Sequence, residues 1–327
     1  MTTSRRICFL LATIAFLAGA TLAYAAEVER GVTVAPLTIH ISPDATSAKL
    51  ANMDRGRELV VLERSRDWIH VTADVTRERT VTGWMKDQAV VRANTPNGDR
   101  ILFGEAADSE AEASRRHGRR GAAQDAMRLY AFTEEYFPKS PLAGEALYRA
   151  ADIRWQLEKA DVMSRPSAKE RDAYLRTGME EDWMRRVMKK YAGTKWADLA
   201  AFALIDNKLC GDWKGESKCP EKETEMYEKY AAERPQSPSA AEALYQAAWR
   251  QSALIQIYRT ENKANKADEA KARALALAQK TVSQYPNNVD WSARAQRLVF
   301  LVDQGIPTYG TAAATSSSDD DGPSQRP

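Results

Sequence analysis

A stretch of fourteen residues occurs twice in this chain of 327 residues. Residues 138–151 read PKSPLAGEALYRAA and residues 235–248 read PQSPSAAEALYQAA, so ten of the fourteen positions are identical. In each copy, proline and serine precede a run of Ala, Leu and Tyr at helical spacing, which is typical of a helix break followed by a helix start. A close repeat of this kind favours stacked helical hairpins, a class that usually binds partners.

The same alternation of apolar helix and turn extends over residues 123–304, so we expect about four helical hairpins there. Within this all-α repeat domain, residues 167–191 are expected to form a long helix between repeats. The expected hairpin turns carry proline or glycine, at Pro138, Ala192-Gly193, Pro235 and Pro286.

Aromatic residues on the repeats are candidate contacts for a partner. Tyr148 and Tyr245 occupy the same position in both copies, so packing is the favoured interpretation for them, whereas Trp249 is a candidate ligand contact. Specificity for a partner is expected where the two copies and their surroundings differ. Arg149 is replaced by Gln246 and Asp152 by Trp249, and the segment around Cys210 and Cys219 lies between the copies.

The ends of these helices carry a further pattern, in which an aromatic residue and proline are followed by serine or asparagine. It stands at Tyr136-Phe137-Pro138-Lys139-Ser140 and at Tyr285-Pro286-Asn287-Asn288. After the first of these, the next helix opens with Ala143-Gly144-Glu145-Ala146-Leu147-Tyr148. The pattern resembles tetratricopeptide-type repeats, in particular those of bacterial outer-membrane assembly and cell-envelope coordinator proteins. The resemblance implies a helical superhelix that binds a protein partner.

Residues 27–93 have the short alternating apolar runs of a β domain. Five strands are expected in this block, at 32–41, 58–62, 68–71, 82–85 and 89–91. Five strands in so short a block suit a small barrel better than an open sheet with exposed edges. The predicted fold class is therefore a small all-β barrel followed by an all-α repeat domain.

Particular residues of this block resemble the bacterial SH3-like (SH3b) domain. They are Ile41-Ser42-Pro43, Gly56 before Leu59-Val60-Val61-Leu62, Trp68-Ile69-His70-Val71, and Gly83-Trp84-Met85. The resemblance implies a cell-envelope protein whose β domain binds peptidoglycan or a peptide.

Four aromatic residues of the β domain are candidate ligand contacts: Trp68, Trp84, His40 and His70. A barrel this small needs large side chains in its core, so core packing is the first interpretation for both tryptophans. The alternative places one tryptophan at the edge of a shallow groove, with His40 or His70 beside it. His70 alternates with Ile69 and Val71, so it is expected to point outward.

The N-terminus predicts export. Residues 1–25 contain Arg5-Arg6, an apolar run and Ala23-Tyr24-Ala25, the pattern of a secretory signal peptide cut after Ala25. Retention of this segment as a membrane anchor is the alternative. After cleavage we expect no transmembrane segment and a secreted or periplasmic location in the cell envelope.

Cys210 and Cys219 are the cysteines that remain after such a cut. In an oxidising compartment, two cysteines that close a short loop favour a disulfide over two free thiols. A metal site is disfavoured because a structural zinc site has four ligands, and the three histidines lie far from the two cysteines in sequence. We expect no bound metal and no cofactor.

Two segments lack clear periodicity. Residues 94–122 are predicted to be a linker, in which residues 105–114 can form one short helix, and their basic run at 115–120 is either a solvated hinge or a contact for anionic lipid or cell-wall polymer. Residues 305–327 are predicted to be a disordered tail, because 313–327 hold almost no large apolar residues.

The sequence disfavours several classes of function. A formal net charge of +2 gives no reason to expect a nucleic-acid partner. No phosphate loop or Cys–His pairing that would indicate catalysis is evident. We therefore expect a non-enzymatic binding or scaffold protein. The alternatives are a structural component of an outer-membrane protein assembly machine and, less favoured, a cell-wall hydrolase.

Overall fold

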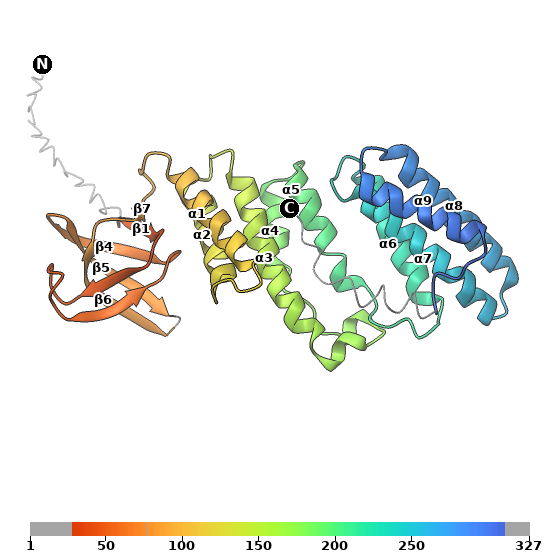
Figure 1. Cartoon of the computed structure of the whole chain (residues 1–327), viewed down its shortest axis with the longest axis horizontal. Coiled ribbons are helices and arrows are strands. Elements are labelled where there is room, and N and C mark those ends of the chain that lie inside the picture. Colours follow the sequence, from red (N-terminus) through yellow and green to blue (C-terminus); the bar gives the residue numbers. More distant parts are fainter. Residues whose placement is uncertain (1–27, 77, 311–327) are drawn as a thin grey trace, which may run out of the picture.

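The computed structural model describes residues 28–76 and 78–310; the predicted signal peptide lies outside them. The described residues form a small β domain followed by a helical domain, which confirms the coarse prediction (Figure 1). The strands are β1 (Arg30–Thr33), β2 (Leu37–His40), β3 (Lys49–Met53), β4 (Glu58–Ser65), β5 (Trp68–Thr76), β6 (Arg79–Lys86) and β7 (Val90–Val91).

All seven strands belong to one curled antiparallel sheet, in the order β3-β2-β6-β5-β4-β1-β7. Its core consists of aliphatic side chains, among them Ile39, Leu59, Ile69 and Met85. These residues alternate along their strands with residues of the other face. The sheet therefore has an apolar inner face and an outer face of mixed character.

The strand count differs from the expected five for two reasons. The expected strand over 32–41 is interrupted between β1 and β2, where Pro36 has no amide proton to donate to a strand ladder. A further strand, β3, was missed because Lys49–Met53 has only Leu50 and Met53 as large apolar residues.

The helical domain consists of α1 (Gly98–Ala113), α2 (Ala122–Tyr136), α3 (Ala143–Met163), α4 (Asp182–Lys190), α5 (Lys195–Ala203), α6 (Lys218–Glu233), α7 (Ala240–Thr260), α8 (Ala264–Gln284) and α9 (Val289–Asp303). The two copies of the repeated stretch run from the α2–α3 turn into α3 and from the α6–α7 turn into α7. Their small residues are buried in the helix packing; Ala146, Ala150, Ala243 and Ala247 are fully inaccessible to solvent. These alanines allow neighbouring helices to approach closely.

The long helix expected over 167–191 is not formed. Pro166–Lys169 and Ala173–Leu175 are single 3₁₀ turns, and α4 begins only at Asp182. Residues 176–181 between them contain Gly178, whose high backbone entropy disfavours a helix.

The segment expected to be a linker mostly forms α1, which packs against α2. Val32 and Val91 of the β domain share one apolar cluster with Leu102 of α1 and with Leu129 and Tyr130 of α2. The apolar pattern of α1 is weak because Leu102 is the only large residue on its buried face, beside Ala106 and Ser109. The basic run therefore lies at the α1–α2 turn rather than in a free hinge.

Polar contacts add to this junction between the domains. The Arg128 Nε donates to the carbonyl oxygen of Gly56 at 3.0 Å, and the Tyr136 hydroxyl donates to Glu58 at 2.7 Å. Gly56 has a φ of +67°, and a Cβ there would lie 3.2 Å from Leu129. A glycine thus permits the close approach of the β domain to α2.

Residues 305–310, where the predicted tail begins, fold back across α7; the rest of the predicted tail lies outside the described residues. Thr308 and Ser252 share a hydrogen bond of 2.7 Å, and the Tyr309 hydroxyl accepts from the Gly215 amide at 3.2 Å. In the part of the chain that the structure describes, no helix is both long and apolar enough to cross a membrane.

Candidate functional site

The four aromatic candidates of the β domain lie together on the outer face of the sheet. Trp84 of β6 is paired with His40 of β2 on one side and with His70 of β5 on the other. Trp68 lies two residues before His70 on β5, and Lys86 of β6 is its cross-strand partner. We call these five residues, His40, Trp68, His70, Trp84 and Lys86, the aromatic face.

The ring of each tryptophan in the aromatic face contacts the ring of one histidine. The His70 and Trp84 rings are stacked, with centroids 4.9 Å apart and planes inclined by 18°. The His40 ring meets Trp68 edge-on at 5.5 Å, and its Nδ1 lies 3.1 Å from the carbonyl oxygen of Ser47. The Lys86 ammonium lies 4.7 Å from the centre of the Trp68 ring, within cation–π distance.

Burial divides the aromatic face into two parts. Trp68 and His40 are each only 7% exposed. Trp84 and His70 are half-buried, so part of their stacked rings is open to solvent. Trp68 is buried, as the first interpretation expects, whereas Trp84 is not; both lie outside the apolar cluster of the inner face because they alternate with its residues along their strands. The stack of Trp84 and His70 is the accessible surface of this site.

Charged residues border the aromatic face. Lys86 forms an ion pair with Asp67, and its hydrogen bond lowers the pKa of that exposed carboxyl below its usual range. Sequence reasoning missed Lys86, since a lone lysine on a strand is usually only solvated. Its position two residues after Trp84, on the same face of a strand, was the available signal.

The candidate aromatics of the repeats make contacts within the molecule. Tyr148 stacks on Trp196 at 5.6 Å, and Tyr245 lies 5.3 Å from Trp291. Trp249 is half-buried and lies 5.2 Å from Trp213, in a cluster that includes Cys219. The structure thus brings Trp249 and the cysteine segment together, as parts of one packed unit.

Cys210 and Cys219 form the expected disulfide, with their Cα atoms 6.1 Å apart. A buried ion pair anchors this loop to the helices. One oxygen of Glu223 accepts from the Cys210 amide at 2.8 Å and from the Trp213 indole at 3.2 Å, while the other accepts from Arg250 Nε at 2.7 Å. The Arg250 guanidinium also lies over the Tyr227 ring at 4.5 Å. Sequence reasoning missed this pair because charged residues on helices are usually exposed.

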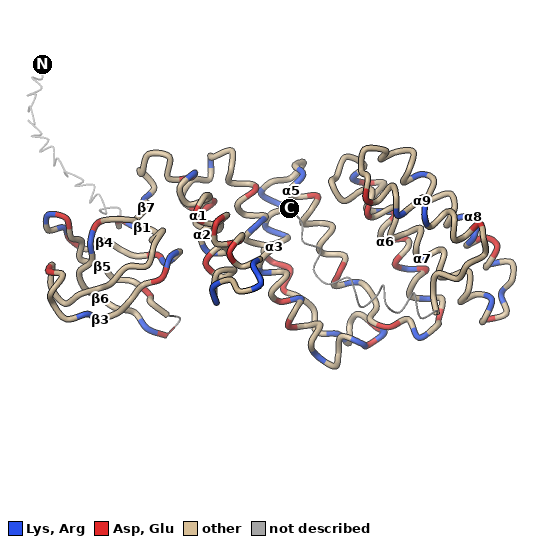
Figure 2. Tube along the Cα trace, viewed as in Figure 1, with Lys and Arg blue, Asp and Glu red and all other residues tan. Residues whose placement is uncertain are grey.

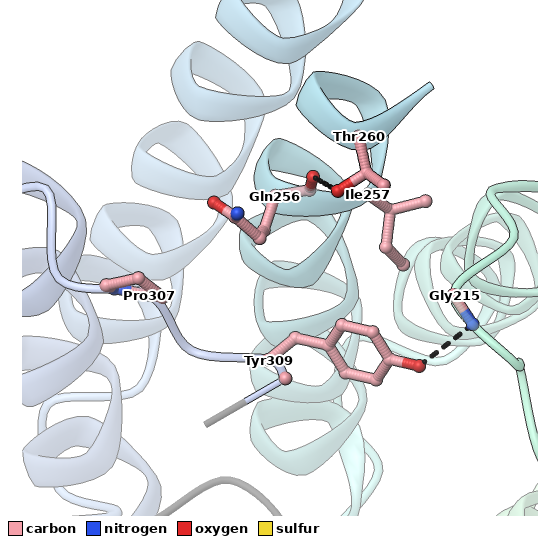
Figure 3. Close-up of a pocket in the computed structure, with 7 residues that line it drawn as sticks. Gly215, Gln256, Ile257, Thr260, Pro307 and Tyr309 are labelled. Carbon is pink, nitrogen blue, oxygen red and sulfur yellow. Dashed lines mark hydrogen bonds between the residues drawn. The ribbon is translucent and has the colours of Figure 1, made fainter. Parts of the chain in front are cut away.

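A cavity of about 290 Å³ lies beside the disulfide loop (Figure 3). Tyr309 closes one side of it and Gln256 and Ile257 of α7 another. Its lining contains no ionisable group other than the Tyr309 phenol; the residues are Gly215, Gln256, Ile257, Thr260, Pro307, Tyr309 and Gly310. The cavity offers hydrogen-bonding groups but no acid, base or strong nucleophile for catalysis.

Acidic and basic residues are interspersed along the trace of the helical domain (Figure 2). Many of them form ion pairs, for example Arg154 with Glu158 and Arg149 with Glu145. Within residues 28–76 and 78–310, no three His, Cys, Asp or Glu side chains gather in a geometry that could hold a metal ion.

Comparison with protein families finds none that the chain matches, and comparison with curated proteins finds no significant relative.

Proposed function

We propose that this chain is an exported, non-enzymatic binding scaffold of the bacterial cell envelope. In this proposal the β domain is of the SH3-like type and binds peptidoglycan or a peptide through the aromatic face. The helical domain is of the tetratricopeptide type and binds a protein partner.

The observation that carries the proposal is the solvent-open stack of His70 and Trp84 next to Lys86. Flat aromatic surfaces bury large areas of a ligand, while ring nitrogens and an ammonium group can fix its orientation by hydrogen bonds. Sugar rings and peptide carboxylates of wall polymer offer the matching groups. Lys86 is already paired with Asp67, and its ammonium group has further N–H groups that can donate to a carboxylate of the ligand.

Two further observations support the wider proposal. The disulfide between Cys210 and Cys219 is typical of proteins from oxidising compartments, which supports export. Contacts between the β domain and α2 hold the two binding modules in a defined relation. Two weak sites in a fixed relation can bind a composite target more tightly than either site alone.

Co-sedimentation of the full chain with purified peptidoglycan tests the wall-binding part. Trp84→Ala should weaken binding about tenfold or more, the usual effect of removing a central aromatic contact. His117→Ala is the control, because this exposed histidine lies on the α1–α2 turn and is not part of the aromatic face. If the native chain fails to sediment but co-purifies with membrane proteins, the assembly-machine alternative replaces this proposal.

A further inference from the structure

The last described helix, α9, has one face that no other described element covers. α9 packs against α8 and α7 through Ser292, Ala295, Leu298 and Val302, at the end of the molecule opposite the β domain (Figure 1). On its other side Val289 is 74% exposed and Phe300 is 60% exposed. Ala293 and Gln296 are exposed between them. We call Val289, Ala293, Gln296 and Phe300 the outer seam of α9.

The spacing of the outer seam is that of a helix pair. Its residues follow one another at intervals of four, three and four, the heptad spacing of positions that meet a second helix. At a rise of about 1.5 Å per residue, the seam extends over about 16 Å. Its ends carry the large apolar side chains and its middle carries the smaller ones. Two helices laid antiparallel over such a seam would place each Phe300 against Val289 of the second copy.

The charges beside the seam select this antiparallel arrangement. Asp290 follows Val289 and Arg297 follows Gln296. Because Asp290 and Arg297 are seven residues apart, they occupy the same heptad position on one side of the seam. Both are exposed, and neither forms an ion pair within the described residues. In the antiparallel pair, Asp290 faces Arg297 of the second copy, and the two-fold axis repeats the contact. In a parallel pair each would instead face the other flank of the seam, where Ser292 and Val299 carry no charge.

We propose that the outer seam of α9 binds a second copy of this chain, in a two-fold antiparallel helix pair. Opposite charges flank the seam in the order that a two-fold axis requires, and a second helix would remove the exposed Val289 and Phe300 side chains from water. This self-association is independent of the proposed wall binding. A dimer would present two aromatic faces at opposite ends of the assembly and so increase avidity for a polymer.

Sedimentation equilibrium of the full chain over a concentration series tests the proposal. The native chain should dimerise, and Phe300→Glu should weaken the dimer about tenfold or more, because it places a carboxylate in the apolar contact. Met163→Glu is the matched control: Met163 is 55% exposed on α3 and should leave dimerisation unchanged. A native chain that stays monomeric, or a Phe300→Glu dimer of native affinity, overturns the proposal.

A second set of variants, which reverses the charges of Asp290 and Arg297, tests the dimer even if Phe300→Glu fails to fold. Asp290→Arg alone and Arg297→Asp alone should each weaken the dimer, because each opposes like charges across the two-fold axis. The double variant restores opposite charges with their order reversed and should regain most of the native affinity. Failure of the double variant to recover, with helix content unchanged by circular dichroism, contradicts the antiparallel arrangement. Unchanged affinity in both single variants would also contradict it.

Discussion

The two copies of the repeated stretch share their local structure but serve different neighbours. In both copies a serine side chain, Ser140 or Ser237, accepts from the amide two residues later at the start of the helix. The first copy then packs toward α1, where Arg149 forms an ion pair with Glu110 at 2.9 Å. The second copy packs toward the disulfide loop, where Arg250 pairs with Glu223. The shared positions build the hairpin, and the differing positions join it to its surroundings.

The differences are largest on the helix faces that meet the flanking segments. Ala126 and Ile153 lie just outside the first copy, on α2 and α3, and pack in one apolar cluster. The residues 97 positions later, beside the second copy on α6 and α7, are Glu223 and Arg250, the buried ion pair. Ala122 is likewise replaced by Cys219, the disulfide cysteine. The same type of helical hairpin can therefore be joined to its neighbours by apolar packing or by an ion pair and a disulfide.

The largest predicted effect comes from breaking the charged junction. Glu223→Ala leaves the Arg250 guanidinium, only 6% exposed, without its partner, and should lower the free energy of unfolding by about 3–5 kcal/mol. Combined with Arg250→Ile, it recreates the residue pair beside the first copy and should recover part of this loss, because no unpaired charge remains buried. Urea denaturation measures both changes.

Arg149→Ala is the control for this comparison. Its ion pairs are partly exposed to solvent, so we expect a loss of about 1 kcal/mol or less. A Glu223→Ala variant with native stability, or a double variant less stable than the single one, would show that the pair does not anchor the loop.

A smaller effect is predicted for removal of the disulfide. Replacing Cys210 and Cys219 by alanine reopens a loop with a sequence separation of 9, which should cost about 2–3 kcal/mol through the entropy of the unfolded chain. Native-state hydrogen exchange should show the loss of protection in α6 and α7 and leave α2 and α3 unchanged, since stability in helical arrays is local. Equal losses in both copies would contradict a local role.

The repeated turns of the fold can be predicted from the sequence, whereas the contacts that join them to their neighbours cannot. Turns at Pro138 and Pro235 are determined by residues that act locally, so they are visible in the repeated stretch alone. The junctions depend on residues far apart in the sequence. Glu223 and Arg250 have the composition of a solvated helix face, and α1 offers only Leu102 as a large buried residue. Neither junction has the apolar periodicity on which prediction relies.

Sequence reasoning named the four aromatic members of the aromatic face as candidates, but it missed Lys86 and the geometry that brings the five residues together. Alternation with Ile69 and Val71 places His70 outward, and this reasoning extends to Trp68 on the same strand. What the sequence does not indicate is the pairing of β2 with β6, which brings His40 opposite Trp84. Contacts between strands that are not adjacent in sequence follow from the curled sheet as a whole.

The smallest predicted effect is the pH dependence of the stability that the side chains of Ser140 and Ser237 contribute through their hydrogen bonds. Ser140 donates to Asp99 at 2.6 Å, and this hydrogen bond holds the pKa of that carboxyl below its usual range. Ser237 instead shares a hydrogen bond of 2.6 Å with Tyr230, whose pKa is raised by burial to about 12. Because the folded pKa of Asp99 is depressed, its contribution to stability is present above the unfolded value of about 3.9 and is lost as the pH falls through the folded value.

The destabilisation caused by Ser140→Ala and by Ser237→Ala should therefore depend differently on pH in the acidic range. The destabilisation caused by Ser140→Ala should shrink by about 0.5 kcal/mol between about pH 6 and about pH 3, since Asp99 is partly exposed and solvent screens the contact. The cost of Ser237→Ala should stay constant over this range, because Tyr230 keeps its proton throughout. Urea denaturation of both variants and the native chain at each pH measures the difference. A cost of Ser140→Ala that does not vary with pH would mean that its role, like that of Ser237, is confined to the turn.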